Sequence, residues 1–131
     1  MEIAASSALF LLRSSELAEQ RVTDPRLRAF AASSIVEQRG IASQLNFAGR
    51  RLDLLPRAAL MPADQALFDA LVASNDFDRA YLRQQRAVLA RAGAIHRDFS
   101  QAGSSPTLRS VARMAEPVHR RQSAALEGLS R

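Results

Sequence analysis

Residues 25–52 read PRLRAFAASSIVEQRGIASQLNFAGRRL. Apolar side chains recur in this segment at intervals of three and four residues, which is the period of one face of an α-helix. Asp24 can cap such a helix at its start, and Pro25 suits its first position. The inward stripe consists of Leu27, Phe30, Ala31, Ser34, Gln38, Ile41, Leu45, Ala48 and Leu52. The segment therefore predicts one amphipathic helix about 40 Å long, at about 1.5 Å per residue.

The same helical period continues on both sides of this segment. It covers residues 7–22, 64–73, 77–101 and 106–128, separated by breaks at Pro56, Pro62, Asn75–Asp76 and Gly103–Pro106. Four long amphipathic helices and one short one predict an all-α fold, an antiparallel up-down four-helix bundle. The short helix lies in the connection between the second and third long helices. Because 131 residues are the length of one domain, residues 1–131 are expected to form a single bundle.

The composition excludes several kinds of chemistry. The sequence has no Cys, so it forms no disulfide scaffold, no Cys-ligated zinc site and no cysteine nucleophile. It contains no Gly-x-Ser-x-Gly elbow, phosphate loop or dinucleotide fingerprint. A di-iron bundle needs a Glu-x-x-His pair from each of two helices, whereas this sequence has one such pair, Glu116 with His119. We therefore predict no catalytic residue, no metal site and no cofactor, and we expect that the chain is not an enzyme.

The two histidines are isolated in the sequence. His96 lies one residue off the apolar stripe that contains Ile95 and Phe99, and His119 stands beside two arginines. Neither has a second His three or four residues away, and Glu116, three residues before His119, is not expected to face inward. We expect both histidines at the surface, with weak metal affinity through one of them as the alternative.

Glutamines interrupt the inward stripes of the long helices. A buried amide must find hydrogen-bond partners, because leaving it unpaired costs about 1–3 kcal/mol. Three interpretations stay open. The amides form hydrogen-bonded pairs that fix the register of the helices, their side chains reach the rim of the bundle, or they line a polar pocket that binds a small ligand between the helices. The candidate ligand-binding residues are Gln38, Gln84 and Gln122.

Arginines account for all 18 basic residues and for the net charge of +5. Four of them, spaced to fall on one face of the third long helix, are the candidate partner- or anion-binding residues: Arg79, Arg83, Arg86 and Arg97. Such a face is either simply solvated or contacts an acidic protein, a second copy of the chain or an anionic membrane surface. Nucleic acid is disfavoured, because the nearest aromatic side chain, Tyr81, is expected to point inward.

Targeting signals are not evident in the chain as given. No apolar run approaches the ~20 residues of a membrane span. The opening Met1-Glu2-Ile3 lacks the positive charge of a secretory signal. A cytoplasmic location is therefore expected, or a periplasmic one if a signal was removed.

Several pieces of the sequence, in order, resemble a bacterial family of domains of unknown function, DUF4142, described as ferritin-like and usually exported. They are residues 10–18 (FLLRSSELA), 27–31 (LRAFA), 35–38 (IVEQ) with Leu45, 77–81 (FDRAY) and Pro117. The resemblance covers nearly the whole chain and implies a ferritin-like four-helix bundle. It implies no activity, because none is established for the family.

The chain departs from the family at the positions that carry polar groups in other members. Leu11 replaces a Glu, Glu37-Gln38 replace an Asp-His pair, and Leu89 and Gln122 each replace a His. Neutral amides and leucines are poor metal ligands, so a metal centre at these positions is not expected here. The sequence thus predicts a non-enzymatic binding or structural module with a closed, largely apolar centre. The alternatives are a small-ligand binder and a degenerate metal-binding bundle.

Overall fold

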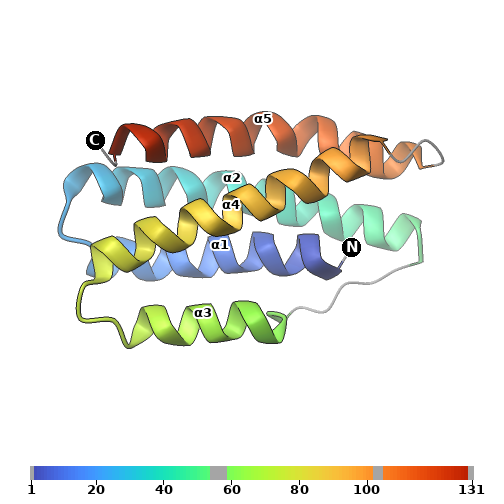
Figure 1. Ribbon diagram of the computed structural model, residues 1–131. Helices are drawn as coiled ribbons and strands as arrows, with labels where there is room; N and C mark the ends of the chain where they lie inside the picture. The colour runs from blue at the N-terminus through green and yellow to red at the C-terminus, as the bar shows by residue number, and fades with distance from the viewer. Residues whose placement is uncertain (1, 54–58, 102–104, 130–131) are drawn as a thin grey trace.

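The computed structural model describes residues 2–53, 59–101 and 105–129, and there the chain forms five α-helices and no strand (Figure 1). They are α1 (Glu2–Arg21), α2 (Pro25–Arg51), α3 (Pro62–Val72), α4 (Phe77–Gln101) and α5 (Pro106–Leu129). The all-α prediction is confirmed. The predicted helix ends hold closely except at α1, which begins well before residue 7. The breaks expected at Pro56 and at Gly103 lie outside the described residues. None of the described helices is long and apolar enough to cross a membrane.

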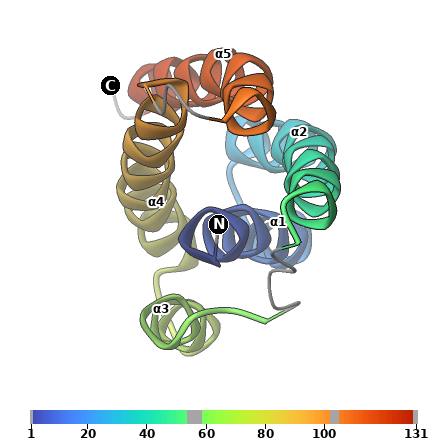
Figure 2. The ribbon, with the colours of Figure 1, turned by 90° about the vertical axis from the view of Figure 1, so that its right-hand side faces the viewer.

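The four long helices surround a common axis. Both α1 and α5 pack against α2 and against α4, so each long helix has two long neighbours. The end-on view shows this ring, with α3 outside it beneath α1 (Figure 2). The short helix contacts α1 and α4. It therefore covers the seam between these two helices rather than joining the ring.

The long helices do not simply alternate in direction along the chain. In Figure 1, α2 and α4 both run from left to right, and α1 and α5 run from right to left. This differs from a strict up-down order, because α3 carries the chain back along the outside before α4 begins. Neighbours around the ring are nevertheless antiparallel.

The apolar core falls into two clusters. One lies where α2 and α4 begin, and includes Phe10, Leu11, Leu27, Phe30, Leu71, Phe77, Tyr81, Val88, Leu89 and Leu126. The other lies toward the opposite end and includes Ala4, Ala8, Ile41, Leu45, Ala48, Val111, Ala115 and Val118. Half of the buried residues named for the second cluster are alanines, and the larger side chains of Ile95, Phe99 and Met114 pack against them.

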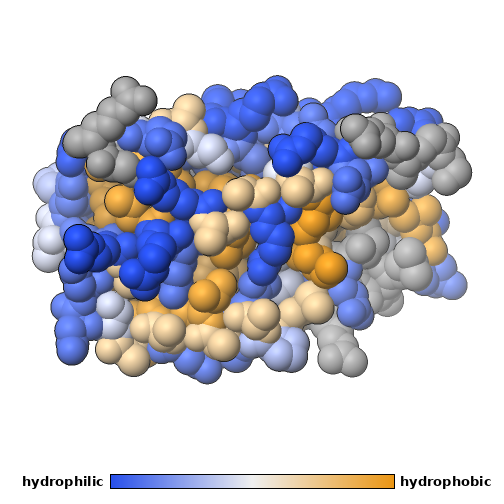
Figure 3. Space-filling view, in the orientation of Figure 1, coloured by the Kyte–Doolittle hydropathy of each residue, from blue (hydrophilic) through white to orange (hydrophobic). Residues whose placement is uncertain are grey.

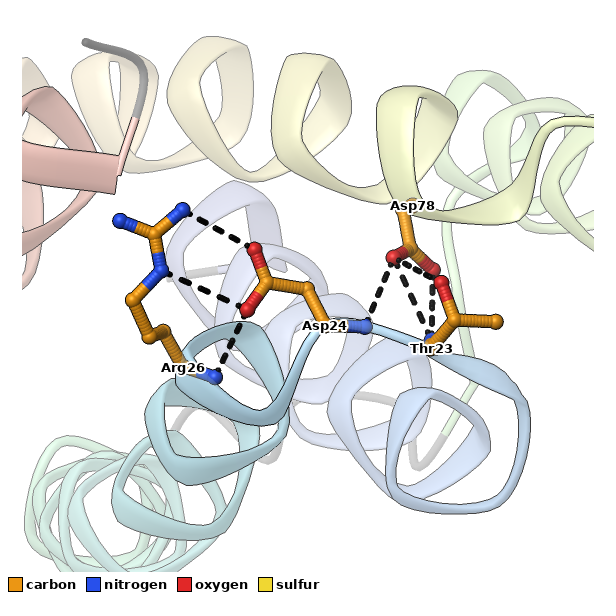
Figure 4. A network of polar contacts seen from close by, with 4 residues as sticks. All are labelled: Thr23, Asp24, Arg26 and Asp78. Carbon is orange, nitrogen blue, oxygen red and sulfur yellow. Dashed lines mark hydrogen bonds and ion pairs between the residues drawn. The ribbon is translucent and has the colours of Figure 1, made fainter.

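The beginning of α4 is tied to the corner between α1 and α2 (Figure 4). Asp78 accepts hydrogen bonds from the Thr23 backbone N at 3.0 Å, from Thr23 Oγ1 at 2.8 Å and from the Asp24 backbone N at 3.0 Å. Asp24 in turn caps α2 by accepting from the Arg26 backbone N at 2.9 Å. Burial raises the pKa of Asp78, but the hydrogen bonds from Thr23 and Asp24 outweigh it and the net pKa is lowered. Both carboxylates therefore hold the corner in their charged form.

Aromatic packing secures the same corner from inside. The Tyr81 ring stacks on Phe77 with 6.1 Å between centroids and meets Phe30 edge-on at 6.4 Å. Its hydroxyl shares a hydrogen bond of 2.7 Å with Ser15 Oγ, and burial raises its pKa. The FDRAY piece is thus explained by structure: it joins α4 to α1 and α2.

Candidate functional site

Polar side chains interrupt the centre of the bundle. Two hydrogen bonds cross it: Gln38 Nε2 donates to Gln122 Oε1 at 3.0 Å, and Gln85 Nε2 donates to Ser14 Oγ at 2.8 Å. The buried polar and charged residues are Ser6, Ser7, Ser14, Ser15, Ser34, Gln38, Asp64, Gln84, Gln85, His96, His119 and Gln122. Most buried residues are nevertheless apolar, so these polar groups are interruptions of a largely apolar centre.

The three candidate glutamines do not converge. Gln38 and Gln122 meet between α2 and α5, whereas Gln84 donates to the backbone O of Leu67 in α3 at 2.9 Å. Gln38 Oε1 and Gln122 Nε2 are buried without a partner. The pair joins two helices across the core, which fits the register-fixing interpretation.

A double-mutant cycle tests that interpretation. Gln38→Leu and Gln122→Leu each leave the other amide unpaired, so each single change should cost about 1–3 kcal/mol of unfolding free energy. The double change removes both amides and should be near neutral or stabilising. Urea denaturation of the four proteins measures the coupling. Additive losses in the double variant would contradict a paired role.

The two histidines lie together between α4 and α5. His96 and His119 are only 1% and 4% exposed, and their ring centroids are 5.1 Å apart. The expectation that both lie at the surface is therefore wrong. Burial lowers the pKa of each to about 4; the charge of Glu116 opposes the shift at His96, and the neighbouring His96 adds to it at His119. Both rings are thus neutral near pH 7.

A groove of about 590 Å³ opens beside this pair and is lined by His119. Its lining comes from α4 and α5 and consists of Leu89, Ala90, Gly93, Arg97, Glu116, His119, Arg120 and Ser123. The hollow exists because Ala90 and Gly93 have small side chains that do not fill this space. A Cβ placed on Gly93 would lie 3.5 Å from Arg97 Nη1, so the Arg97 side chain extends across the glycine. The groove gives solvent a route to His119.

Helical spacing carried a signal for the buried histidines. His96 follows the buried Ala92 by one turn, and His119 follows the buried Ala115 by one turn. Residues one turn apart share a face. The neighbouring arginines concealed this signal, because a basic neighbourhood suggests exposure.

Asp64 forms a second buried polar cluster that sequence reasoning missed. Its side chain is 3% exposed and accepts from Arg91 Nη2 at 2.6 Å and from Ser6 Oγ. Arg91 also donates to Ser7 Oγ at 3.1 Å, and the Met61 backbone N donates to Ser6 Oγ at 2.9 Å. These bonds join the start of α3 to α1 and α4. Asp64 lies two turns before the inward-facing Leu71, and residues at that spacing share a helix face. This spacing was the sequence signal that Asp64 faces inward.

The four candidate arginines divide into two groups. Arg79, Arg83 and Arg86 are exposed and line one hollow of about 630 Å³ together with Leu82 and Ala87. Arg97 is also exposed but belongs to the groove between α4 and α5. Strongly hydrophilic side chains gather over the first turns of α4, beside apolar surface (Figure 3). The first three arginines therefore form a continuous cationic face, called here the α4 arginine face.

The positions at which the chain departs from the family pattern are buried except Glu37, which is partly exposed. Leu11, Gln38, Leu89 and Gln122 are at most 4% exposed. In the described ranges, no group of three or more His, Asp or Glu side chains is placed to hold a metal ion. Leucines and paired amides thus fill the place where charged or imidazole groups were expected from the resemblance.

Comparison with known proteins gives one match. The model of a protein family described as "Domain of unknown function (DUF4142)" matches residues 1–129. No curated protein and no solved structure matches the chain.

Proposed function

The chain belongs to the DUF4142 family, and from this premise we propose that it is a non-enzymatic helical module that binds an acidic protein surface through the α4 arginine face. The single crossover made by α3 is the arrangement of ferritin-like bundles, which supports that classification of the fold. A binding role needs an exposed surface whose charged side chains are not already paired within the protein.

The α4 arginine face includes such unpaired side chains. Arg86 pairs with Glu127 at 2.9 Å. Within the described part of the chain, no ion pair or hydrogen bond engages the side chain of Arg79 or Arg83. A guanidinium forms two parallel hydrogen bonds with a carboxylate, so neighbouring arginines favour a partner rich in Asp and Glu. Leu82 and Ala87 add apolar contact beside the charges.

The buried polar groups favour structure over catalysis. The hydroxyls of Ser6, Ser14 and Ser15 bond to Asp64, Gln85 and Tyr81 respectively. Among the described residues, no serine hydroxyl is hydrogen-bonded to a histidine, as a base-activated nucleophile would be. These groups are occupied in holding helices together.

Charge reversal tests the proposal. Arg79→Glu/Arg83→Glu should weaken binding to poly-L-glutamate by roughly tenfold or more at low salt, because attraction becomes repulsion. Arg50→Glu/Arg51→Glu, at the end of α2, makes the same change in net charge and serves as the control. Isothermal titration measures both, with increasing salt expected to weaken wild-type binding.

Three outcomes decide between the partners. Loss confined to the α4 variant supports an acidic protein partner. Equal loss in both variants would assign binding to net charge and contradict the proposal. The wild-type chain could instead bind phosphatidylglycerol vesicles and not poly-L-glutamate, with vesicle binding lost in the α4 variant. That result would contradict a protein partner and indicate a membrane surface.

A further inference from the structure

Three buried polar atoms without a hydrogen-bond partner belong to neighbouring residues of α4 and α5. They are Nδ1 of His96, Nδ1 of His119 and Oε1 of Glu116. Buried polar groups are nearly always satisfied, so several unsatisfied ones in one place call for an explanation such as an ion or water. The carboxylate of Glu116 acts electrostatically on His96. One negative charge therefore lies near two neutral rings.

The separation of the rings suits a shared metal ion. A Zn–N bond is about 2.0–2.1 Å long, so two imidazoles on one tetrahedral ion place their centroids about 5 Å apart. The observed separation of the His96 and His119 centroids is 5.1 Å, with the ring planes inclined by 41°. Metal binding also requires neutral imidazole with a free electron pair, and the Nδ1 atom of each ring is buried without a hydrogen-bond partner.

We propose that His96 and His119 together bind one divalent ion of the Zn²⁺ or Cu²⁺ class, with solvent completing its coordination and Glu116 balancing its charge. The site is limited to two histidines, because the described residues offer no third ligand already in place. The groove between α4 and α5 gives solvent and ions access to His119, against which His96 lies. This site lies apart from the α4 arginine face and does not depend on the proposed function.

The surroundings set the affinity and the selectivity. Arg97 and Arg120 also line the groove, and Arg120 lies 3.9 Å from Glu116. Their positive charges oppose a cation, so we expect modest affinity. Imidazole nitrogen suits Cu²⁺ and Zn²⁺, whereas Mg²⁺ and Ca²⁺ prefer oxygen ligands. Cu²⁺ should bind more tightly than Zn²⁺, and Mg²⁺ should not compete.

The test is a titration of the untagged full chain near pH 7 with Zn²⁺ alone, up to millimolar concentration. We expect one ion per chain. His96→Phe and His119→Leu should each weaken binding by roughly tenfold or more, because each removes one of the two protein ligands. Ser123→Ala changes the groove without touching either ring and is the matched control, with unchanged affinity.

A second measurement does not depend on whether the variants fold. The sequence contains two histidines, so imidazole NMR signals of the wild-type chain report on this pair alone. Both sets of signals should shift on addition of Zn²⁺ and be insensitive to Mg²⁺. Absence of binding, binding that leaves the imidazole signals unchanged, or equal affinity in the histidine variants would overturn the proposal.

Discussion

Asp64→Ala should lower the unfolding free energy by about 3 kcal/mol, at the low end for breaking a buried ion pair. The loss is not larger because the Arg91 side chain is 36% exposed, so its freed guanidinium can reach water. Ser6 would lose its acceptor as well. Because these bonds hold the start of α3, its amide hydrogens should become unprotected before those of the long helices.

Asp69→Ala provides the matched control on the same helix. Asp69 is exposed and accepts a local hydrogen bond from Gln65 at 2.9 Å. Its removal should change stability by no more than about 0.5 kcal/mol. Urea unfolding followed by circular dichroism measures both variants. Similar small losses in the two proteins would show that the Asp64 cluster does not hold α3.

Acidification from pH 7 to pH 4 should destabilise the protein through the histidine pair. His96 and His119 have pKa values of about 4 when folded, against about 6.5 in an unfolded chain. In that window the unfolded chain binds more protons, so the stabilisation is complete above pH 6.5 and lost as the pH falls toward 4. The full shift corresponds to at most about 3 kcal/mol per histidine.

The double variant His96→Phe/His119→Leu should have a much flatter stability profile over the same range. Measurements with a chelator present exclude any contribution from metal ions. Asp24 and Asp78 add to the loss only below about pH 5, because their folded pKa values lie below the value of 3.8 for an unfolded Asp, so the change between pH 7 and pH 5 reports the histidines. A wild-type stability that stays constant between pH 7 and pH 4.5 would be incompatible with neutral buried histidines.

Helix positions were predictable because their signals are local. Asp24 and Pro25 mark the start of α2, and Phe77 begins α4 as expected. The inward positions of Gln38 and Gln122 were predicted from the same local period, but their hydrogen bond to each other was not. Residues a few positions apart in sequence are enough to define a period, a cap or a break.

The remaining features depend on contacts between distant segments. Asp64 is buried because Arg91 lies opposite it on another helix, and no local pattern announces that pairing. His96 and His119 stand 23 positions apart and meet only because α4 and α5 are antiparallel. The direction of α4 was missed for the same reason. Its first turn returns to the α1–α2 corner only because α3 reverses the chain.

The passage of α3 along the outside divides the chain into two hairpins, α1–α2 and α4–α5. Each hairpin joins helices that are consecutive in sequence, so its contacts span short loops and can form rapidly. Docking one hairpin on the other requires closing a much longer loop, and this step should limit the folding rate. The fold thus has the organisation of two early-forming units assembled by a slower, non-local association.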